Sequence, residues 1–291
     1  MKKQYALTGE TFDLSEMIRR HSGDETISYK TVNGEPIHLS YFYPDILSDG
    51  VHPALVLVHG GGWASRKIFP DQKDLWQGDY LGYLARYYSL KGYVCVCVDY
   101  RLSREGGQAH SYQLADCWDD CCDAMDYILD HAISHHIDTN DVSVLGESAG
   151  GHLAGLLATA YHRSGFRFQK AFLINSILDF TSCPVWAGHI PKDTKHPVLQ
   201  PMNFDARVGY LSPICHIHAD LCPVVLIHGL EDNTVGVYHS ENFYEKMLSM
   251  ELSCDLHLIE KTRHAFLLAE YTNNPIANRI GISILDQYLL A

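Results

Sequence analysis

Apolar residues along the chain gather in short runs, separated by longer segments of helical period. Strands are predicted where β-branched and aromatic residues stand together in such a run. The predicted strands are ISYKTV from 27, IHLSYFY from 37, ALVLVHG from 54, YVCVCVDY from 93, VSVLG from 142, AFLINS from 171, VVLIHG from 224 and DLHLIE from 255. The runs from 54, 142 and 224 are continuously apolar, which is typical of strands covered on both faces.

Between these runs, apolar residues recur every three or four positions, which predicts helices. The predicted helices cover residues 75–90, 111–134, 149–162, 239–250 and 277–290. Alternation of strand and helix predicts an α/β fold with a mainly parallel central sheet, helices on both faces and an antiparallel N-terminal part. The 291 residues, 46% of them hydrophobic, suit one domain over residues 1–291.

Residues 179–220 interrupt this rhythm. The segment carries five of the eleven prolines and shows little periodicity. Such a segment is typical of an insertion over the sheet, which forms a lid or a wall of a binding site. A surface excursion with no role in the site is the alternative.

The amino-acid composition indicates which kinds of binding partner the protein has. A formal net charge of −13 disfavours nucleic acid and anionic membrane surfaces, and it is compatible with a small neutral substrate. The N-terminus has no apolar stretch of signal-peptide length, and no apolar run approaches the roughly 20 residues that cross a bilayer. The nine cysteines follow no pairing pattern, so we expect a cytoplasmic protein. A homodimer is left open.

One serine stands where an apolar run turns into a helical run, in VSVLGESAGGHLAG from 142. Glycines at 146 and 150 allow a sharp strand-to-helix turn, because side chains there would collide with the neighbouring strand and helix. This turn lifts the Ser148 hydroxyl above the sheet. It also leaves the Ala149 N–H at the helix start, aimed at an anion. We therefore predict that Ser148 is a nucleophile.

A second motif follows the strand from 54, in the sequence HGGGW at 59–63. Three consecutive glycines let backbone N–H groups approach a substrate oxygen that becomes negative in a tetrahedral intermediate. Gly61 and Gly62 are therefore predicted to form an oxyanion hole together with Ala149. A flexible turn is the alternative interpretation.

The last third of the chain offers an acid and a base. The strand from 224 leads into LEDNTV, which holds Glu231 and Asp232, and KTRHAF presents His264 after the strand from 255. One helix-strand unit separates these loops, so both are predicted at the carboxyl edge of the sheet, where α/β proteins bind ligands. His264 is the predicted base for Ser148.

Together, HGGGW, GESAGGHLA, HGLEDNTV and RHAF resemble the α/β-hydrolase fold from about residue 54 to the C-terminus. Within this fold the chain resembles the His-Gly-Gly-Gly serine esterases, which include hormone-sensitive-lipase-like enzymes and acetyl-xylan and feruloyl esterase-like enzymes. The family orders its triad as serine, acid and histidine, which implies Ser148, Asp232 and His264. The sequence departs from related enzymes at Ala265, where glycines are frequent.

Other candidate residues have simpler interpretations. His59 and His228 are expected to brace loops, and His131 and His135 to lie at a solvated helix end without a metal. The acidic residues of the same helix are expected to solvate its outer face; they are Asp116, Asp119, Asp120 and Asp123. Trp63 and Trp186 are predicted to contact the substrate as an aromatic wall, with core packing as the alternative.

The function favoured by these residues is hydrolysis of short acyl esters, with acetyl esters of carbohydrates as the finer expectation. The substrate would be a small ester, and neither a cofactor nor a metal is required. The His-Gly-Gly-x-Trp loop also resembles amidases of the kynurenine-formamidase type. A small-molecule-binding protein without catalysis is the third hypothesis, because the fold has been reused for receptors.

Overall fold

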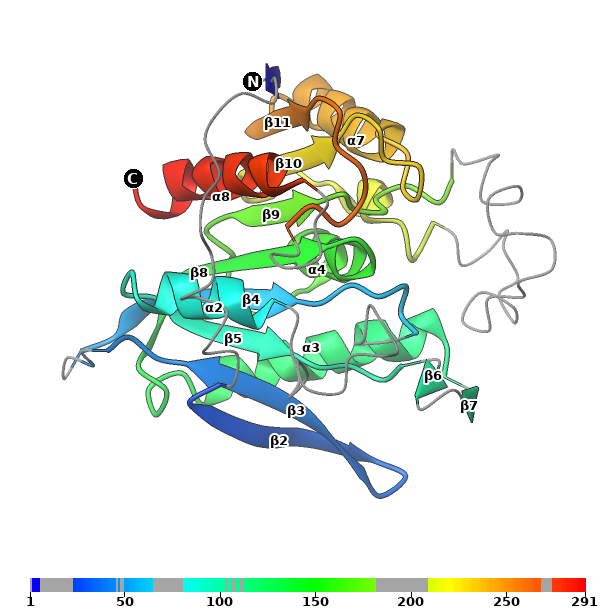
Figure 1. Cartoon of the computed structure of the whole chain (residues 1–291). Coiled ribbons are helices and arrows are strands. Elements are labelled where there is room, and N and C mark those ends of the chain that lie inside the picture. Colours follow the sequence, from blue (N-terminus) through cyan, green and yellow to red (C-terminus); the bar gives the residue numbers. More distant parts are fainter. Residues whose placement is uncertain are drawn as a thin grey trace.

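A nine-stranded sheet runs through the protein, with helices packed on both faces (Figure 1). The structure, a computed structural model, describes residues 2–5, 23–45, 47, 50–64, 81–102, 104–105, 108–109, 112–181, 209–267 and 274–291. The strands are β1 (Lys2–Tyr5), β2 (Glu25–Val32), β3 (Glu35–Phe42), β4 (His52–Val58), β5 (Val94–Val98), β6 (Arg104–Glu105), β7 (Gln108–Ala109), β8 (Ile137–Glu147), β9 (Ala171–Ile174), β10 (Val224–Gly229) and β11 (Cys254–Ile259). The helices are α2 (Gly82–Ser89), α3 (Leu114–Asp130), α4 (Ala149–Ala160), the 3-10 helix η1 (Pro213–His216), α7 (Tyr238–Ser249) and α8 (Pro275–Leu289).

The strand order is β1-β11-β10-β9-β8-β4-β5-β3-β2. From β1 to β5 every neighbouring pair is parallel, whereas β3 pairs antiparallel with both β5 and β2. The predicted mainly parallel sheet with an antiparallel N-terminal part is therefore confirmed. Because β8 and β10 are parallel, their carboxyl ends lie at the same edge of the sheet.

The hydrophobic pattern of the sequence does not predict strand β1 or the strand pair β6 and β7. Strand β1 lies at the far edge of the sheet and pairs in parallel with β11, Lys2 opposite Leu256. Its sequence, KKQY, has no apolar alternation, so the ladder of backbone hydrogen bonds forms without a local signal. The pair of two-residue strands β6 and β7 is too short for any period to show.

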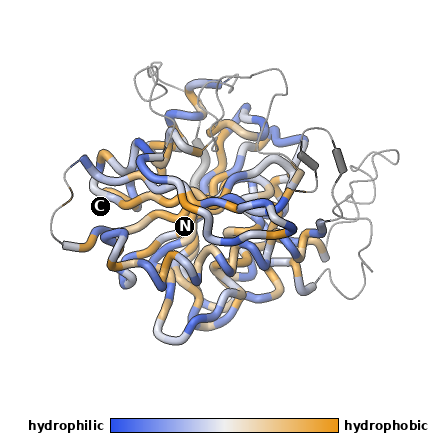
Figure 2. Tube along the Cα trace, turned by 90° about the horizontal axis from the view of Figure 1, so that it is seen from below, coloured by the Kyte–Doolittle hydropathy of each residue, from blue (hydrophilic) through white to orange (hydrophobic). Residues whose placement is uncertain are grey.

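Alternate residues of the central strands face two separate hydrophobic layers. In β4, Ala54, Val56 and Val58 pack with the apolar faces of α3, α4 and α7. Leu55 and Leu57 point to the other face, where α2 and α8 cover the sheet. Figure 2 shows the result, with hydrophobic positions on the strands inside and hydrophilic positions on the outer turns. The two layers cover both faces of the sheet. Polar side chains that bind or react with a ligand are therefore expected at the ends of the strands.

Helix α3 ends before residue 134, where the hydrophobic period of the sequence predicts its end. The helix ends at Asp130, and residues 131–136 form turns instead of a further helical turn. His135 is 8% exposed there, and its ring stacks on Tyr41 at a centroid distance of 4.1 Å. The expectation of a solvated helix end is thus wrong for His135, which packs against β3, and holds for the exposed His131.

The expected solvated acidic face of α3 is also wrong at one position. Asp120 is fully buried, and its carboxylate accepts hydrogen bonds from Arg101 Nε at 2.7 Å and from Lys30 Nζ at 2.6 Å. These contacts join α3 to β2 and to the loop after β5. The helical period alone does not show this, because the two cations come from distant parts of the chain.

Replacement of Asp120 by Asn is expected to lower the free energy of unfolding by about 3 kcal/mol, because two partly buried cations lose their buried counter-charge and keep only the more exposed carboxylates of Asp116 and Asp123. Chemical denaturation of the variant measures this loss. Asp123→Asn is the matched control, since the Asp123 side chain also pairs with Lys30 but is 51% exposed; it should cost less than about 1 kcal/mol. Equal losses in the two variants would contradict the buried pairing.

Most of the predicted insertion at 179–220 lies outside the described residues, which include only 179–181 and 209–220 of it. Its role as a lid or wall stays a prediction. Within the described residues, no helix combines the length and apolar character needed to span a bilayer.

Candidate active site

Ser148 occupies the sharp turn between β8 and α4. Its backbone is left-handed, with φ 57° and ψ −123°, a conformation that costs energy for any residue except glycine. The turn is held by the Ser148 N–H, which donates to the Ile174 carbonyl of β9 at 2.9 Å. Strain at one residue, maintained by the surrounding sheet, is typical of a functional position.

The glycines at 146 and 150 are required by close backbone contacts. A Cβ atom on Gly146 would lie 2.3 Å from the Gly150 carbonyl oxygen, and one on Gly150 would lie 2.0 Å from the Val58 carbonyl oxygen. Neither contact is sterically allowed. The predicted role of both glycines in closing the turn is confirmed, and the turn is locked against the end of β4.

A histidine and a carboxylate complete a relay with this serine. His264 Nε2 lies 2.8 Å from Ser148 Oγ, and His264 Nδ1 lies 2.6 Å from Asp232 Oδ2. An ionised carboxylate can only accept hydrogen bonds, so Nδ1 carries the proton and Nε2 accepts from the serine hydroxyl. The structure thus brings together the three residues that the sequence singled out for the triad.

Asp232 is held in its ionised form. Burial raises the pKa of its carboxyl group, but hydrogen bonds from His228 and His264, and the attraction to either ring when it is protonated, outweigh burial, so the pKa lies well below its usual range. Its other oxygen, Oδ1, accepts from the backbone N–H groups of Thr234 at 2.9 Å and Val235 at 2.8 Å. The carboxylate is therefore fixed in position and in charge, whereas Glu231 beside it is exposed.

The loops that carry Asp232 and His264 are bonded to each other. The Glu231 N–H donates to the Thr262 carbonyl at 2.9 Å, and the Leu230 N–H donates to the Ile259 carbonyl at 2.9 Å. Ala265 has φ 60°, a left-handed conformation that glycine adopts without strain. The histidine loop keeps its turn here despite the methyl group.

The glycine-rich loop follows β4, the neighbour of β8 in the sheet. Gly61, Gly62 and Trp63 have φ values of 96°, 63° and 54°, so three consecutive residues are left-handed. The loop is braced by Tyr100, whose hydroxyl donates to the His59 carbonyl at 2.7 Å and whose ring stacks on the His59 imidazole. The structure therefore places Gly61 and Gly62 in a sharply turned loop after β4, and their role in an oxyanion hole stays a prediction.

His59 and His228 brace loops as expected. His59 Nδ1 lies 2.8 Å from the Gly60 carbonyl oxygen. His228 Nε2–H donates to the Val235 carbonyl at 2.9 Å, and Nδ1 accepts from the Ser240 hydroxyl at 2.8 Å. His228 Nε2 also lies 3.4 Å from Asp232 Oδ2, the carboxylate oxygen that binds His264.

Trp63 is enclosed beneath the glycine-rich loop. It is 2% exposed, and its ring meets the edge of His152 at 5.4 Å and Phe180 at 6.2 Å between centroids. Burial lowers the pKa of His152 to about 4, so its ring is neutral. The packing alternative therefore holds for most of the Trp63 ring, and its substrate contact stays a prediction. Trp186 lies outside the described residues.

Two polar residues of the site carry no motif that sequence reasoning recognised. Asn175 follows β9 with φ 46°, and its Oδ1 accepts from the Gly229 N–H at 3.1 Å. Glu147 precedes Ser148 and is 1% exposed. An asparagine or glutamate directly after a continuously apolar strand is the only signal that could have marked them, and that signal is weak.

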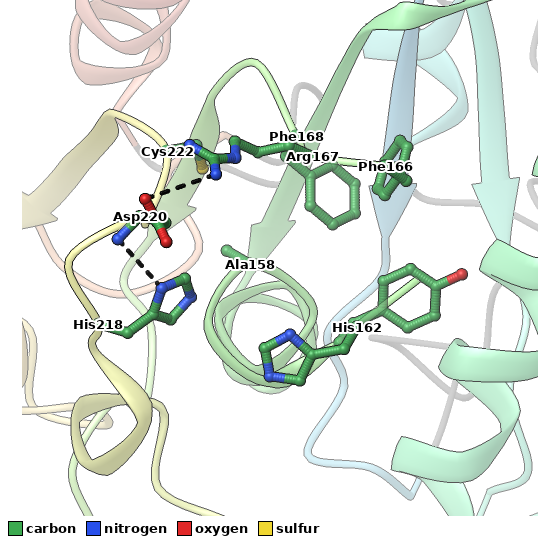
Figure 3. A pocket seen from close by; sticks show the side chains of 9 residues that line it. Ala158, His162, Phe166, Arg167, Phe168, His218, Asp220 and Cys222 are labelled. Atoms are coloured by element: carbon green, nitrogen blue, oxygen red, sulfur yellow. Dashed lines mark hydrogen bonds and ion pairs between the residues drawn. The ribbon is translucent and has the colours of Figure 1, made fainter. Parts of the chain in front are cut away.

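A separate cavity of about 220 Å³ is lined by residues that include Ala158, His162, Phe168 and His218 (Figure 3). Its lining residues 166–168 and 218–222 precede β9 and β10, so it lies at the end of these strands opposite the relay. Arg167 and Asp220 form an ion pair of 3.6 Å on its rim. None of the relay residues lines it. In the described ranges, no group of three histidine, cysteine, aspartate or glutamate side chains could hold a metal ion.

The parallel sheet, the serine at a strained strand-to-helix turn and the chain order serine, aspartate, histidine together define an α/β-hydrolase fold. The chain belongs to the BD-FAE family, whose model matches residues 41–247.

Comparison with known proteins agrees with this fold. The chain is 26% identical over 273 residues to "Probable carboxylic ester hydrolase LipM" of Mycobacterium tuberculosis, which covers 86% of this chain and 58% of LipM. It therefore spans little more than half of that relative's length. Among solved structures, esterase 2 of Thermogutta terrifontis phosphonylated by sarin superposes with a TM-score of 0.75 and 25% identity, covering 93% of this chain and 95% of that one. The butyrate-bound form of the same esterase gives a TM-score of 0.73 at 25% identity, covering 92% and 94%.

Proposed function

We propose that this protein is a serine carboxylic ester hydrolase that cleaves short acyl esters. The observation that carries the proposal is the relay from Ser148 Oγ through His264 to Asp232, with distances of 2.8 and 2.6 Å, on a serine held in a strained turn. The relatives support it. LipM bears the name of a carboxylic ester hydrolase, and esterase 2 has been described with butyrate bound and phosphonylated by sarin.

In the proposed first step, Ser148 Oγ attacks the ester carbonyl while His264 Nε2 takes its proton. Asp232 keeps the proton of the imidazole on Nδ1 and stabilises the imidazolium that forms. The negative charge on the carbonyl oxygen is held by the N–H groups of Gly61, Gly62 and Ala149, each worth about 3 kcal/mol in such sites. His264 then gives its proton to the leaving alcohol.

The second half of the cycle repeats these roles with water. The acyl group remains on Ser148 Oγ, and His264 removes a proton from a water molecule that attacks the acyl carbonyl. Collapse of the second tetrahedral intermediate releases the acid and returns the proton to Ser148. Every proton moves through one imidazole, so the reaction requires no proton carrier beyond the relay.

The finer substrate proposal is an acetyl ester, including acetylated carbohydrates. It rests on the resemblance in sequence, and we propose the insertion at 179–220 as the lid or wall that selects the acyl and alcohol groups. Trp63 and Trp186 are proposed as parts of the substrate-binding walls. The cytoplasmic location and the homodimer remain predictions.

Hydrolysis of p-nitrophenyl acetate, butyrate and octanoate by the purified protein tests the proposal. We expect kcat/KM to fall at least about tenfold from acetate to octanoate, since about 1.4 kcal/mol of lost transition-state binding gives that factor. N-formylkynurenine is assayed in parallel. Faster turnover of the formamide would favour the amidase hypothesis. No turnover of any substrate, together with no labelling by a fluorophosphonate probe, would favour a binding protein.

A further inference from the structure

Glu147 is a buried acid that the proposed reaction does not use. It is the last residue of β8, adjacent in the chain to Ser148, and it is 1% exposed. Neither of its carboxyl oxygens has a hydrogen-bond partner among the described residues. No cation of the described residues acts on its pKa either, so an ionised carboxylate at this position would be costly.

Four elements of the site meet around this carboxyl group. The Asp232 carboxylate, in the loop after β10, acts on it through its negative charge, and the Leu267 N–H of the histidine loop acts on it as a nearby donor. The Asn175 side-chain amide faces it from the end of β9, and the Tyr83 phenol from α2. The two amides make no hydrogen bond of standard geometry to it. Glu147 therefore lies at the point where the strand of the nucleophile meets the loops of the acid and the base.

Burial and the negative charge of Asp232 keep Glu147 protonated. Burial and the negative charge of Asp232 raise its pKa, and the Leu267 N–H and Asn175 amide offset this only in part, so the pKa is about 8. Burial, and then the nearness of Glu147, raise the pKa of Tyr83 well above its usual value, so the phenol stays neutral. Among the described residues, the charged group that acts on Glu147 is Asp232.

We propose that Glu147 is a positioning residue that must be a neutral acid for the triad to work: its uncharged carboxyl group fills the buried space beside the strand of the nucleophile and adds no charge near Asp232. This inference rests on the proposed esterase function. Ionisation has two harmful consequences. A carboxylate would attract the Leu267 N–H, three residues after His264, and shift the histidine loop. It would also add negative charge next to Ser148, to which the substrate is bonded when its carbonyl oxygen becomes an oxyanion.

Glu147→Gln tests the proposal, because glutamine has nearly the same shape and remains neutral at every pH. We expect kcat/KM of wild type for p-nitrophenyl acetate to fall about tenfold from pH 7 to pH 9, as titration of one group near pH 8 gives. The Gln variant should stay within about threefold of wild type at pH 7 and fall less than about twofold up to pH 9. Glu231→Gln, a matched change at the exposed neighbour of Asp232, should follow wild type.

Thermal unfolding supplies a readout that does not depend on ester hydrolysis. The pKa of Glu147 in the folded protein, about 8, lies above its ordinary value of 4.5. The folded state therefore binds the additional proton between these values, and stability is lost as pH rises through that window. The Tm of Glu147→Gln minus that of wild type should grow by several degrees from pH 5 to pH 8 and then stay constant.

The two readouts separate the possible failures. If both enzymes hydrolyse the ester with the same pH profile, the positioning role is wrong even where the Tm difference grows. If the Tm difference is constant as well, Glu147 does not titrate as the structure indicates. If neither protein hydrolyses any ester, the proposed function fails and the positioning role fails with it, while a growing Tm difference would still establish the buried acid.

Discussion

Ser148→Ala should lower ester hydrolysis by about 10⁴-fold or more while leaving the fold intact. The variant removes the atom that attacks the carbonyl in the proposed reaction, so we expect no acyl-enzyme to form. It also removes the hydrogen bond to His264 Nε2, which contributes roughly 1 kcal/mol to stability. Alanine has the same backbone restriction as serine at φ 57°, so the strain of the turn is unchanged. Single-turnover hydrolysis of p-nitrophenyl acetate and thermal unfolding measure the two effects.

Ser134→Ala provides the control for this experiment. Ser134 is exposed in the turns after α3, where its hydroxyl donates to the His131 carbonyl at 2.7 Å, and it has no contact with the relay. Its replacement should leave kcat/KM unchanged. Activity retained by Ser148→Ala at more than a few per cent of wild type would mean that another group performs the chemistry, and the proposed site would be rejected.

Gly150→Ala should damage both stability and activity. The added Cβ would lie 2.0 Å from the Val58 carbonyl oxygen and 2.4 Å from the His59 carbonyl oxygen, which are backbone atoms that cannot rotate away. Either α4 moves away from the sheet or the glycine-rich loop shifts. We expect a loss of more than about 3 kcal/mol in the free energy of unfolding. Displacement of the loop by about 1 Å should lower kcat by roughly 10²-fold.

Gly209→Ala is the matched control for that change. Nothing lies within 4 Å of a Cβ added at Gly209, and its φ is outside the left-handed region, so alanine fits without strain. The free energy of unfolding should change by less than about 1 kcal/mol. Denaturation curves and p-nitrophenyl acetate assays of both variants test the pair. Wild-type behaviour of Gly150→Ala would contradict the close approach of helix and loop that the structure shows.

Two buried carboxyl groups of the site, those of Asp232 and Glu147, have pKa values shifted in opposite directions. Asp232 is paired with two histidines and two backbone N–H groups, so its pKa falls despite burial. Glu147 has no such partners, and burial dominates. The carboxyl group of Asp232, in the loop after β10, is thus an anion, whereas that of Glu147, at the end of β8, is a neutral acid. This difference allows a single negative charge to act on His264.

Much of this architecture is readable from local patterns. The runs from 54, 142 and 224 are continuously apolar because strands β4, β8 and β10 are covered on both faces, and the observed strands agree with them. The glycines at 146 and 150 are required by contacts within one turn of chain and its immediate neighbour. Strand β1 and the early end of α3 could not be predicted, because pairing and packing with distant residues decide them.

The sequence by itself determined the alternation of strand and helix, the turn chemistry at Ser148 and the candidates for acid and base. These properties follow from residue type, period and spacing, which are local. Only the tertiary structure decided that His264 bonds to a serine 116 residues away, that Asp120 is a buried partner of two cations, and that Glu147 faces Asp232. Burial and electric field at a side chain are set by neighbours from other elements, and a linear pattern does not contain their positions.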